Sequence, residues 1–158
     1  MSRRIAVPLI VLTLGAVASA AYGSAASGTV ASARPAAASS APSLKAGSSK
    51  YGKVLFDRGG RVLYTFARDH GKASTCYGGC AAAWPPFKVK QAPKAGAGVR
   101  SGLLGTTRRR DGSLQGTYAG HPLYYFTGDK KPGQITCQNV SSFGGRWFVI
   151  NPNGKPVH

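Results

Sequence analysis

Acidic residues are scarce in this chain of 158 residues. It contains no glutamate and only four aspartates (Asp57, Asp69, Asp111 and Asp129), against 21 lysines and arginines. Over residues 21–158 the formal charge is +15, from 19 basic and 4 acidic side chains. An excess of this size repels itself in a compact fold and attracts polyanions. The composition therefore favours polyanionic partners.

Familiar catalytic and metal-binding patterns are missing as well. The chain has no Gly-x-Ser-x-Gly nucleophile elbow and no Gly-x-x-x-x-Gly-Lys-Ser/Thr phosphate loop. Its three cysteines and three histidines (His70, His121 and His158) have neither zinc-knuckle nor His-x-x-x-His spacing. The single methionine, Met1, excludes methionine-rich copper binding. We expect no metal and no cofactor, with His70 and His121 as surface or turn residues.

Long apolar runs are absent except near the N-terminus. Arg3 and Arg4 precede an apolar run over 5–18, and small residues follow up to Ala20. This pattern predicts a signal peptide, residues 1–20. The run is shorter than the roughly 20 residues of a spanning helix, and no cysteine near the cleavage point could carry a lipid. We therefore expect a secreted, extracytoplasmic protein without a transmembrane anchor, released or held non-covalently by the cell envelope.

Residues 21–49 consist almost entirely of Ala, Ser, Gly and Pro, with no aromatic residue after Tyr22. Such a segment cannot bury enough surface to offset the entropy of ordering, so it is predicted to be a disordered linker. Residues 50–158 are long enough for one domain with a single core and too short for two.

A short sequence occurs twice in this predicted domain. Leu-Tyr-Thr-Phe-Ala-Arg-Asp at 63–69 recurs as Leu-Tyr-Tyr-Phe-Thr-Gly-Asp at 123–129, and a tryptophan follows each copy, Trp84 and Trp147. Duplication at this spacing indicates one supersecondary unit built twice. We expect a mainly β domain of two tandem antiparallel meander repeats, about 50–98 and 99–158, packed as one pseudo-symmetric unit.

Turn signals and side-chain alternation fill in this outline. Turns are predicted at 57–60, at Asp111-Gly112 and at 119–122, and a strand at 146–150, with at most one short helix near 75–83. Period-two geometry places Tyr64 with Phe66, and Tyr124 with Phe126, on one face of their strands. These four aromatic residues are expected to form or line the shared core.

The linked motifs carry a resemblance to a known family. They are Tyr64-x-Phe66-x-x-Asp69, the segment from Cys76 to Trp84-Pro85-Pro86, and Tyr118-x-Gly120-x-Pro122-Leu123-Tyr124-x-Phe126-x-x-Asp129. Together they resemble the bacterial secreted-repeat, or predicted lipoprotein, family with its Tyr-x-aromatic-x-x-Asp motif. That resemblance implies an architecture and no assigned function. The chain departs from the family pattern in lacking a lipidated cysteine and in carrying Cys137 where a small residue is expected.

Asp69 and Asp129 form a matched pair of carboxylates. Glycoside hydrolases use such a pair, in which one group donates a proton and the other attacks the substrate or activates water. The alternative is structural, because an aspartate just after a strand can accept backbone N–H groups of the following loop. The acid and the base of such an enzyme need different environments, whereas duplication of the fold places the two aspartates in similar ones. We therefore favour the structural interpretation.

Three cysteines in an exported protein predict a disulfide. Cys76 and Cys80 flank a flexible Tyr-Gly-Gly and are the favoured pair. Cys137 lies near the equivalent place in the second repeat and could instead pair with either one. A redox role would need an exposed, activated thiolate.

Arg108, Arg109 and Arg110 form the only dense basic cluster, and alternation places Arg109 on the opposite face from the other two. Guanidinium groups bind phosphate and carboxylate bidentately, so the three are candidates for anion binding. The alternative is a charged edge strand that discourages aggregation.

Three functions remain open. The leading hypothesis is a basic, non-enzymatic envelope protein that binds anionic cell-envelope polymers or acidic polysaccharide. The second is an extracytoplasmic redox or metal-handling protein using the cysteines, and the third a carbohydrate-active enzyme using Asp69 and Asp129. No groove-entering helix or basic stripe with interleaved aromatics indicates sequence-specific nucleic-acid binding. Nothing in the sequence indicates an oligomeric state.

Overall fold

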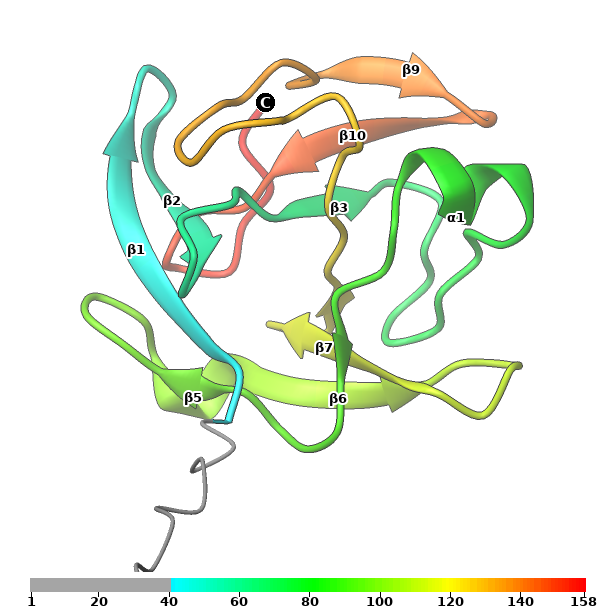
Figure 1. The fold of residues 1–158 in the computed structure, drawn as a ribbon, viewed down its shortest axis with the longest axis horizontal. Helices are drawn as coiled ribbons and strands as arrows, with labels where there is room; N and C mark the ends of the chain where they lie inside the picture. The colour runs from blue at the N-terminus through cyan, green and yellow to red at the C-terminus, as the bar shows by residue number, and fades with distance from the viewer. Residues whose placement is uncertain (1–40) are drawn as a thin grey trace, which may run out of the picture. The chain divides into compact units, whose positions relative to one another are not determined.

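The computed structural model describes residues 41–158 (Figure 1). In chain order the elements are β1 (Ser43–Ser49), β2 (Gly52–Asp57), β3 (Tyr64–Phe66), α1 (Gly79–Ala83), β4 (Lys88–Val89), β5 (Lys94–Ala95), the 3-10 turn η1 (Ser101–Leu103), β6 (Leu104–Arg108), β7 (Leu114–Tyr118), β8 (His121–Pro122), β9 (Val140–Ser142) and β10 (Gly145–Val149). The predicted signal peptide and most of the predicted linker lie outside the described residues. No helix within 41–158 is long and apolar enough to cross a bilayer.

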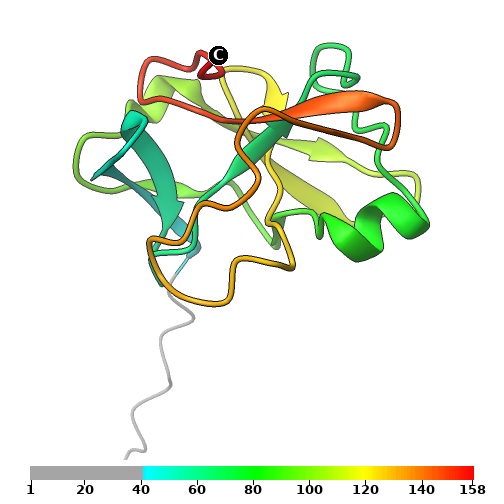
Figure 2. The same ribbon diagram turned by 90° about the horizontal axis from the view of Figure 1, so that it is seen from above.

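Within the described range the strands form three small sheets, ordered β2-β1-β5, β3-β10-β9 and β4-β7-β6, with β8 paired to β7. All pairings are antiparallel except the short parallel contact between β1 and β5. In Figures 1 and 2 the β1–β2 hairpin and α1 lie on opposite sides of the domain, and in Figure 1 β3 and β10 lie between them, with β6 below. The prediction of a mainly β fold with one short helix is confirmed.

The predicted linker extends too far toward the C-terminus. β1 lies inside the segment 21–49 and pairs with β2 over six residues, from Leu44 opposite Asp57 to Ser49 opposite Gly52. Leu44 is fully buried. A Cβ added at Gly47 would lie 2.9 Å from the Phe56 ring, so a residue without a side chain is required there. Gly47, one of the small residues that suggested a linker, thus lets this strand pack closely against the Phe56 ring of β2.

The second hairpin follows the prediction closely. β6 and β7 flank Asp111-Gly112, where Gly112 has a φ of 78°. Ala119 (φ 49°) and Gly120 (φ 82°) make a two-residue turn of the kind that suits a twisted hairpin. The predicted turn at 119–122 is shorter in the structure, because residues 121–122 form β8 and pair back onto β7.

The two halves meet at Tyr64 and Tyr124. Tyr64 N donates to the Tyr124 carbonyl over 2.8 Å, and Tyr124 N donates to the Tyr64 carbonyl over 2.9 Å. Further backbone hydrogen bonds also occur in matched pairs, one in each half. The bond from Ala67 N to the Arg146 carbonyl matches the bond from Thr127 N to the Ala83 carbonyl. The bond from Leu55 N to the Ile150 carbonyl matches the bond from Gly116 N to the Phe87 carbonyl. This pattern is that of two like halves joined about the tyrosine pair.

Buried side chains separate into two clusters, and the alternation of β3 decides which cluster each residue joins. Tyr64 and Phe66 belong to a cluster with Trp84, Tyr124 and Trp147. Residues of the opposite strand face join a second, largely aliphatic cluster, which contains Leu44, Leu55, Leu63, Phe87, Tyr118, Leu123 and Ile150. Both clusters draw on both repeats, so neither half buries its apolar residues alone.

Candidate functional site

The motif tyrosine of each repeat donates a hydrogen bond to the motif aspartate of the other repeat. Tyr64 Oη donates to Asp129 Oδ2 over 2.7 Å. Tyr124 Oη donates to Asp69 Oδ2, also over 2.7 Å. The Tyr-x-aromatic-x-x-Asp motif is therefore completed only when two copies pack together.

Each aspartate also holds the loop that follows it. Asp69 Oδ1 accepts the backbone N–H and the hydroxyl of Thr75, each over 2.8 Å. Asp129 Oδ1 accepts the same two groups of Thr136, over 3.0 and 2.6 Å. Both oxygens of both carboxylates thus have donors, and the structure contains the loop-holding bonds expected of a structural aspartate.

Burial shifts the pKa values of the two motif tyrosines and of Asp69. It raises the pKa of Tyr64, and the hydrogen bond to Asp129 raises that pKa further. It also raises the pKa of Tyr124, as does the charge of Asp69, so both phenols remain protonated donors at neutral pH. The pKa of Asp69 is raised by burial, against the opposing hydrogen bonds from Tyr124 and Thr75.

Four rings stack through the centre of the domain, drawn alternately from the two repeats. Phe66 stacks on Trp147 at 4.1 Å between centroids and Trp147 on Trp84 at 3.9 Å, and the Phe126 ring lies 4.5 Å from Trp84, tilted by 38°. Tyr64 meets Trp84 edge-on at 5.2 Å, and Tyr124 meets Trp147 in the same way at 5.1 Å. The aromatic residues singled out in the sequence thus lie together at the seam between the repeats.

The three arginines of the basic cluster separate. Arg109 is 4% exposed and donates to the Ser74 hydroxyl, the Gln115 amide oxygen and the Cys76 carbonyl, so it is no surface contact for anions. Its guanidinium lies 4.3 Å from the Tyr77 ring centroid, and its Nε has no hydrogen-bond partner. The alternation that set Arg109 apart already carried the signal for its burial.

The other two arginines of the cluster remain on the surface. Arg108 and Arg110 are exposed. Arg108 Nη1 donates to the Gly112 carbonyl over 2.9 Å, inside its own hairpin. Arg110 lies 4.8 Å from the centroid of the Tyr77 ring. Both guanidinium groups are therefore accessible to an external anion.

The disulfide joins Cys76 to Cys80, with 5.3 Å between their Cα atoms. Both half-cystines are buried. Cys137 is a free, partly buried thiol, and burial raises its pKa. A buried bridge and a thiol with a raised pKa favour a structural role for these cysteines over the redox hypothesis.

We expect thiol titration to reproduce this cysteine arrangement. Protein purified without reductant and unfolded in guanidinium should titrate as one thiol per chain, and the Cys137→Ser variant as none. In the native protein the Cys137 thiol should react slowly, because it is partly buried and its raised pKa disfavours the reactive thiolate. Three titratable thiols, or one thiol remaining in Cys137→Ser, would contradict the assignment.

The histidines lie apart from one another. His70 is exposed, His121 of β8 pairs through its backbone with Tyr118 of β7, and the His158 ring contacts Phe148. Among residues 41–158 no group of three or more His, Cys, Asp or Glu side chains could hold a metal ion.

The surface of the described domain is dominated by unbalanced positive charge. Residues 41–158 carry eighteen Lys and Arg against four Asp, and sixteen of the eighteen are exposed. Arg58 aside, one ion pair joins residues of this range, Lys88 to Asp111 at 3.3 Å. Ser113 lowers the pKa of Asp111 to about 2 through its hydroxyl and its backbone N–H.

The remaining aspartate, Asp57, is also occupied within the fold. Its Oδ1 accepts Arg61 N and its Oδ2 accepts the Tyr125 hydroxyl, each over 2.9 Å. All four carboxylates are therefore engaged in contacts within the fold, and most of the exposed cations have no carboxylate to balance them.

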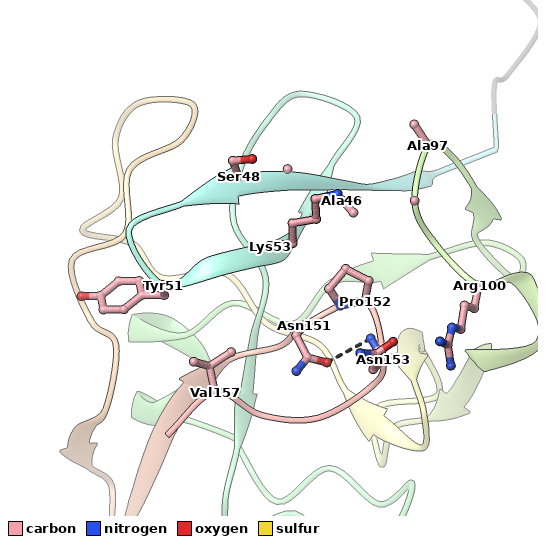
Figure 3. A pocket seen from close by; sticks show the side chains of 12 residues that line it. Ala46, Ser48, Tyr51, Lys53, Ala97, Arg100, Asn151, Pro152, Asn153 and Val157 are labelled. Carbon is pink, nitrogen blue, oxygen red and sulfur yellow. Dashed lines mark hydrogen bonds between the residues drawn. The ribbon is translucent and has the colours of Figure 1, made fainter.

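A cavity of about 770 Å³ lies between the β1–β2 hairpin, the segment after β5 and the C-terminal turn (Figure 3). Its volume falls within the roughly 300–1,000 Å³ typical of small-ligand sites. Its lining contains two cations, two asparagines, a tyrosine and a proline, and no acidic residue: Lys53, Arg100, Asn151, Asn153, Tyr51 and Pro152 among others. Neither Asp69 nor Asp129 lines it.

Hydrogen bonds hold the sides of this cavity in place. The Tyr118 hydroxyl accepts Arg100 N over 3.1 Å and donates to the Pro152 carbonyl over 2.7 Å, so it ties two walls together. Asn151 Oδ1 accepts Asn153 N over 3.0 Å, which fixes the C-terminal turn. The sequence indicated only a turn here, because the lining comes from three distant segments with no shared motif.

Two segments of the chain, residues 45–88 and 105–151, match a family described as a secreted repeat of unknown function. Each segment contains one copy of the tyrosine, aspartate and tryptophan set, and together they cover more than half of the 158 residues. Comparison with curated proteins and with solved structures finds no match. The expected resemblance is confirmed, and the chain belongs to this family of secreted repeats.

Proposed function

We propose that this protein is a non-enzymatic binding module of the cell envelope and that its ligands are anionic envelope polymers. The observation that carries the proposal is the charge imbalance of the folded surface. Sixteen exposed Lys and Arg side chains face solvent, while the four carboxylates are engaged in contacts within the fold. Polyanions outside the cell supply the missing countercharge.

The charge distribution suits a polymer better than a compact anion. Exposed cations occur on the β1–β2 hairpin, around β4 and β5, on the β6–β7 hairpin and in the loop before β9, for example Lys50, Lys90, Arg110 and Lys131. Individual exposed charges contribute little, but a chain of negative charges meets many of them and releases counterions. Affinity therefore comes from the number of contacts.

The motif residues support a binding role over the glycosidase hypothesis. Asp69 and Asp129 each receive a tyrosine hydroxyl on one oxygen and a threonine on the other. A carboxylate with both oxygens engaged is a poor nucleophile, and neither residue lines the cavity of Figure 3. The motif contributes to the scaffold that carries the cationic surface.

The experiment measures binding of the secreted protein to purified wall teichoic acid and to heparin over a range of salt concentrations. We expect binding at low salt and a fall in affinity of roughly tenfold or more between 50 and 200 mM salt, because exposed charges are screened. A neutral glucan of similar length serves as the control and should not bind. No binding to either polyanion at low salt, or equal binding to the neutral glucan, would refute the proposal.

A further inference from the structure

We propose that the cavity of Figure 3 is a specific subsite for a short run of carboxylated sugar units of an acidic polysaccharide. This inference rests on the proposed function and names the place and the chemical class of its ligand. General electrostatic attraction would bring the polymer to the surface, and the cavity would recognise a few adjacent units of it.

Charge is the first argument for an anion in this cavity. Lys53 from β2 and Arg100 from the segment before η1 both contribute to the lining, and no carboxylate does. In the part of the chain that the structure describes, neither cationic group has a hydrogen bond or ion pair to another residue. Figure 3 shows Lys53 near the middle of the view and Arg100 at one side of it. Two cations without internal partners, placed apart in the lining, suit carboxylates of neighbouring units in one polymer.

The remaining lining residues suit a sugar ring better than a phosphate chain. Tyr51 lies at the opposite end of the view from Arg100 and offers an aromatic ring. The side chains of Asn151 and Asn153 provide amide groups that can hydrogen-bond hydroxyl groups. Ring faces and hydroxyl groups are present in a uronic acid and absent from a polyphosphate chain. Aromatic, amide and cationic groups together therefore favour a carboxylated sugar.

The cavity is held open before any ligand arrives. Tyr118 ties the backbone of Arg100 to that of Pro152, and Ala46 N donates to the Ala97 carbonyl over 2.9 Å. A Cβ at Gly98 would lie 2.9 Å from that of Ala46, so this wall closes tightly only because residue 98 has no side chain. Fixed walls reduce the ordering cost of binding.

The test compares the secreted protein with two charge-matched double variants. Lys53→Gln with Arg100→Gln removes both cavity cations, and Lys130→Gln with Lys131→Gln removes the same charge from exposed lysines in the loop before β9. The probes are an oligogalacturonate, a neutral galactose oligomer of equal length, and a polyphosphate with the same number of charges. Affinities come from calorimetry, and NMR shifts on titration with the oligogalacturonate locate the site.

We expect the cavity variant to lose at least about tenfold in affinity for oligogalacturonate, because two charged contacts are lost. The loop variant should lose less than about threefold. Oligogalacturonate should shift the amides of Tyr51 and Asn153, and the neutral oligomer should not bind. Unchanged unfolding curves would show that both variants fold.

Three results would overturn parts of this account in different ways. Equal losses in the two double variants would refute the subsite and leave general polyanion binding standing. Equal losses of oligogalacturonate and polyphosphate binding in the cavity variant would refute the assignment to a sugar. Failure of the unmodified protein to bind any of the polyanions would refute the subsite and the proposed function together.

Discussion

The Trp147→Ala variant is expected to lose about 3–5 kcal/mol of unfolding free energy, and the Trp84→Ala variant a similar amount. Both indoles are almost fully buried, at 0% and 1% exposure, and they stack on each other at the centre of the four-ring stack. Removing either ring leaves a cavity at the seam between the repeats, where both halves lose contacts. Urea unfolding followed by circular dichroism would measure the loss.

Phe143→Ala is the matched control for the tryptophan variants. Phe143 is also aromatic, but it is 46% exposed at the tip of the β9–β10 hairpin. Its removal should change the unfolding free energy by no more than about 0.5 kcal/mol. A loss below about 1 kcal/mol in either tryptophan variant, or a large difference between the two, would contradict the equivalence of the repeats.

The second large effect is expected at the reciprocal tyrosine–aspartate bonds. Tyr64→Phe and Tyr124→Phe should each cost about 1.5–3 kcal/mol of unfolding free energy, the range for hydrogen bonds to charged groups. Each substitution removes one hydroxyl and leaves a carboxylate of the other repeat with one donor fewer. The ring and its packing stay in place.

Tyr51→Phe provides the comparison for these two substitutions. The Tyr51 hydroxyl has no internal hydrogen bond in the described part of the chain, so its loss should cost no more than about 0.5 kcal/mol. If both motif variants matched Tyr51→Phe in stability, the reciprocal bonds would contribute nothing, and the structural interpretation of the motif would lose its support.

Local patterns in the sequence were sufficient to predict much of this fold. Alternation placed Tyr64 and Phe66 on one face of β3, and the structure puts Leu63 in the opposite cluster. The Asp111-Gly112 turn and the strand at 146–150 follow from turn chemistry and β propensity, which act over a few residues. Repetition of the motif added the one long-range prediction, a core shared by two halves.

What the sequence could not show depends on contacts between distant segments. β1 has a linker-like composition, and only its partner β2 and the Phe56 ring explain its small residues. Alternation set Arg109 apart from its neighbours, but the sequence could not identify Ser74, Gln115 and the Cys76 carbonyl as the groups that accept its hydrogen bonds. The hydrogen bonds from each motif tyrosine to the aspartate of the other repeat could not be predicted for the same reason.

Duplication also explains why the cavity escapes a motif search. The residues of the seam occur once in each repeat, because each tyrosine donates a hydrogen bond to the aspartate of the other copy. The cavity lining comes from the β1–β2 hairpin, the connection between the repeats and the C-terminal turn, three segments that are far apart in the sequence. The repeated motif therefore identifies the seam and not the cavity.

A set of three double-mutant cycles tests the central claim most directly, that each motif is completed by the other repeat. Unfolding free energies are measured for Tyr64→Phe, Asp129→Asn and the double variant, for the Tyr124 and Asp69 set, and for the within-repeat combination of Tyr64→Phe with Asp69→Asn. The account predicts coupling of about 1 kcal/mol or more in the two cross-repeat cycles, and less than about 0.5 kcal/mol in the within-repeat cycle. Coupling confined to tyrosine and aspartate of the same repeat, or absent from all three cycles, would contradict it.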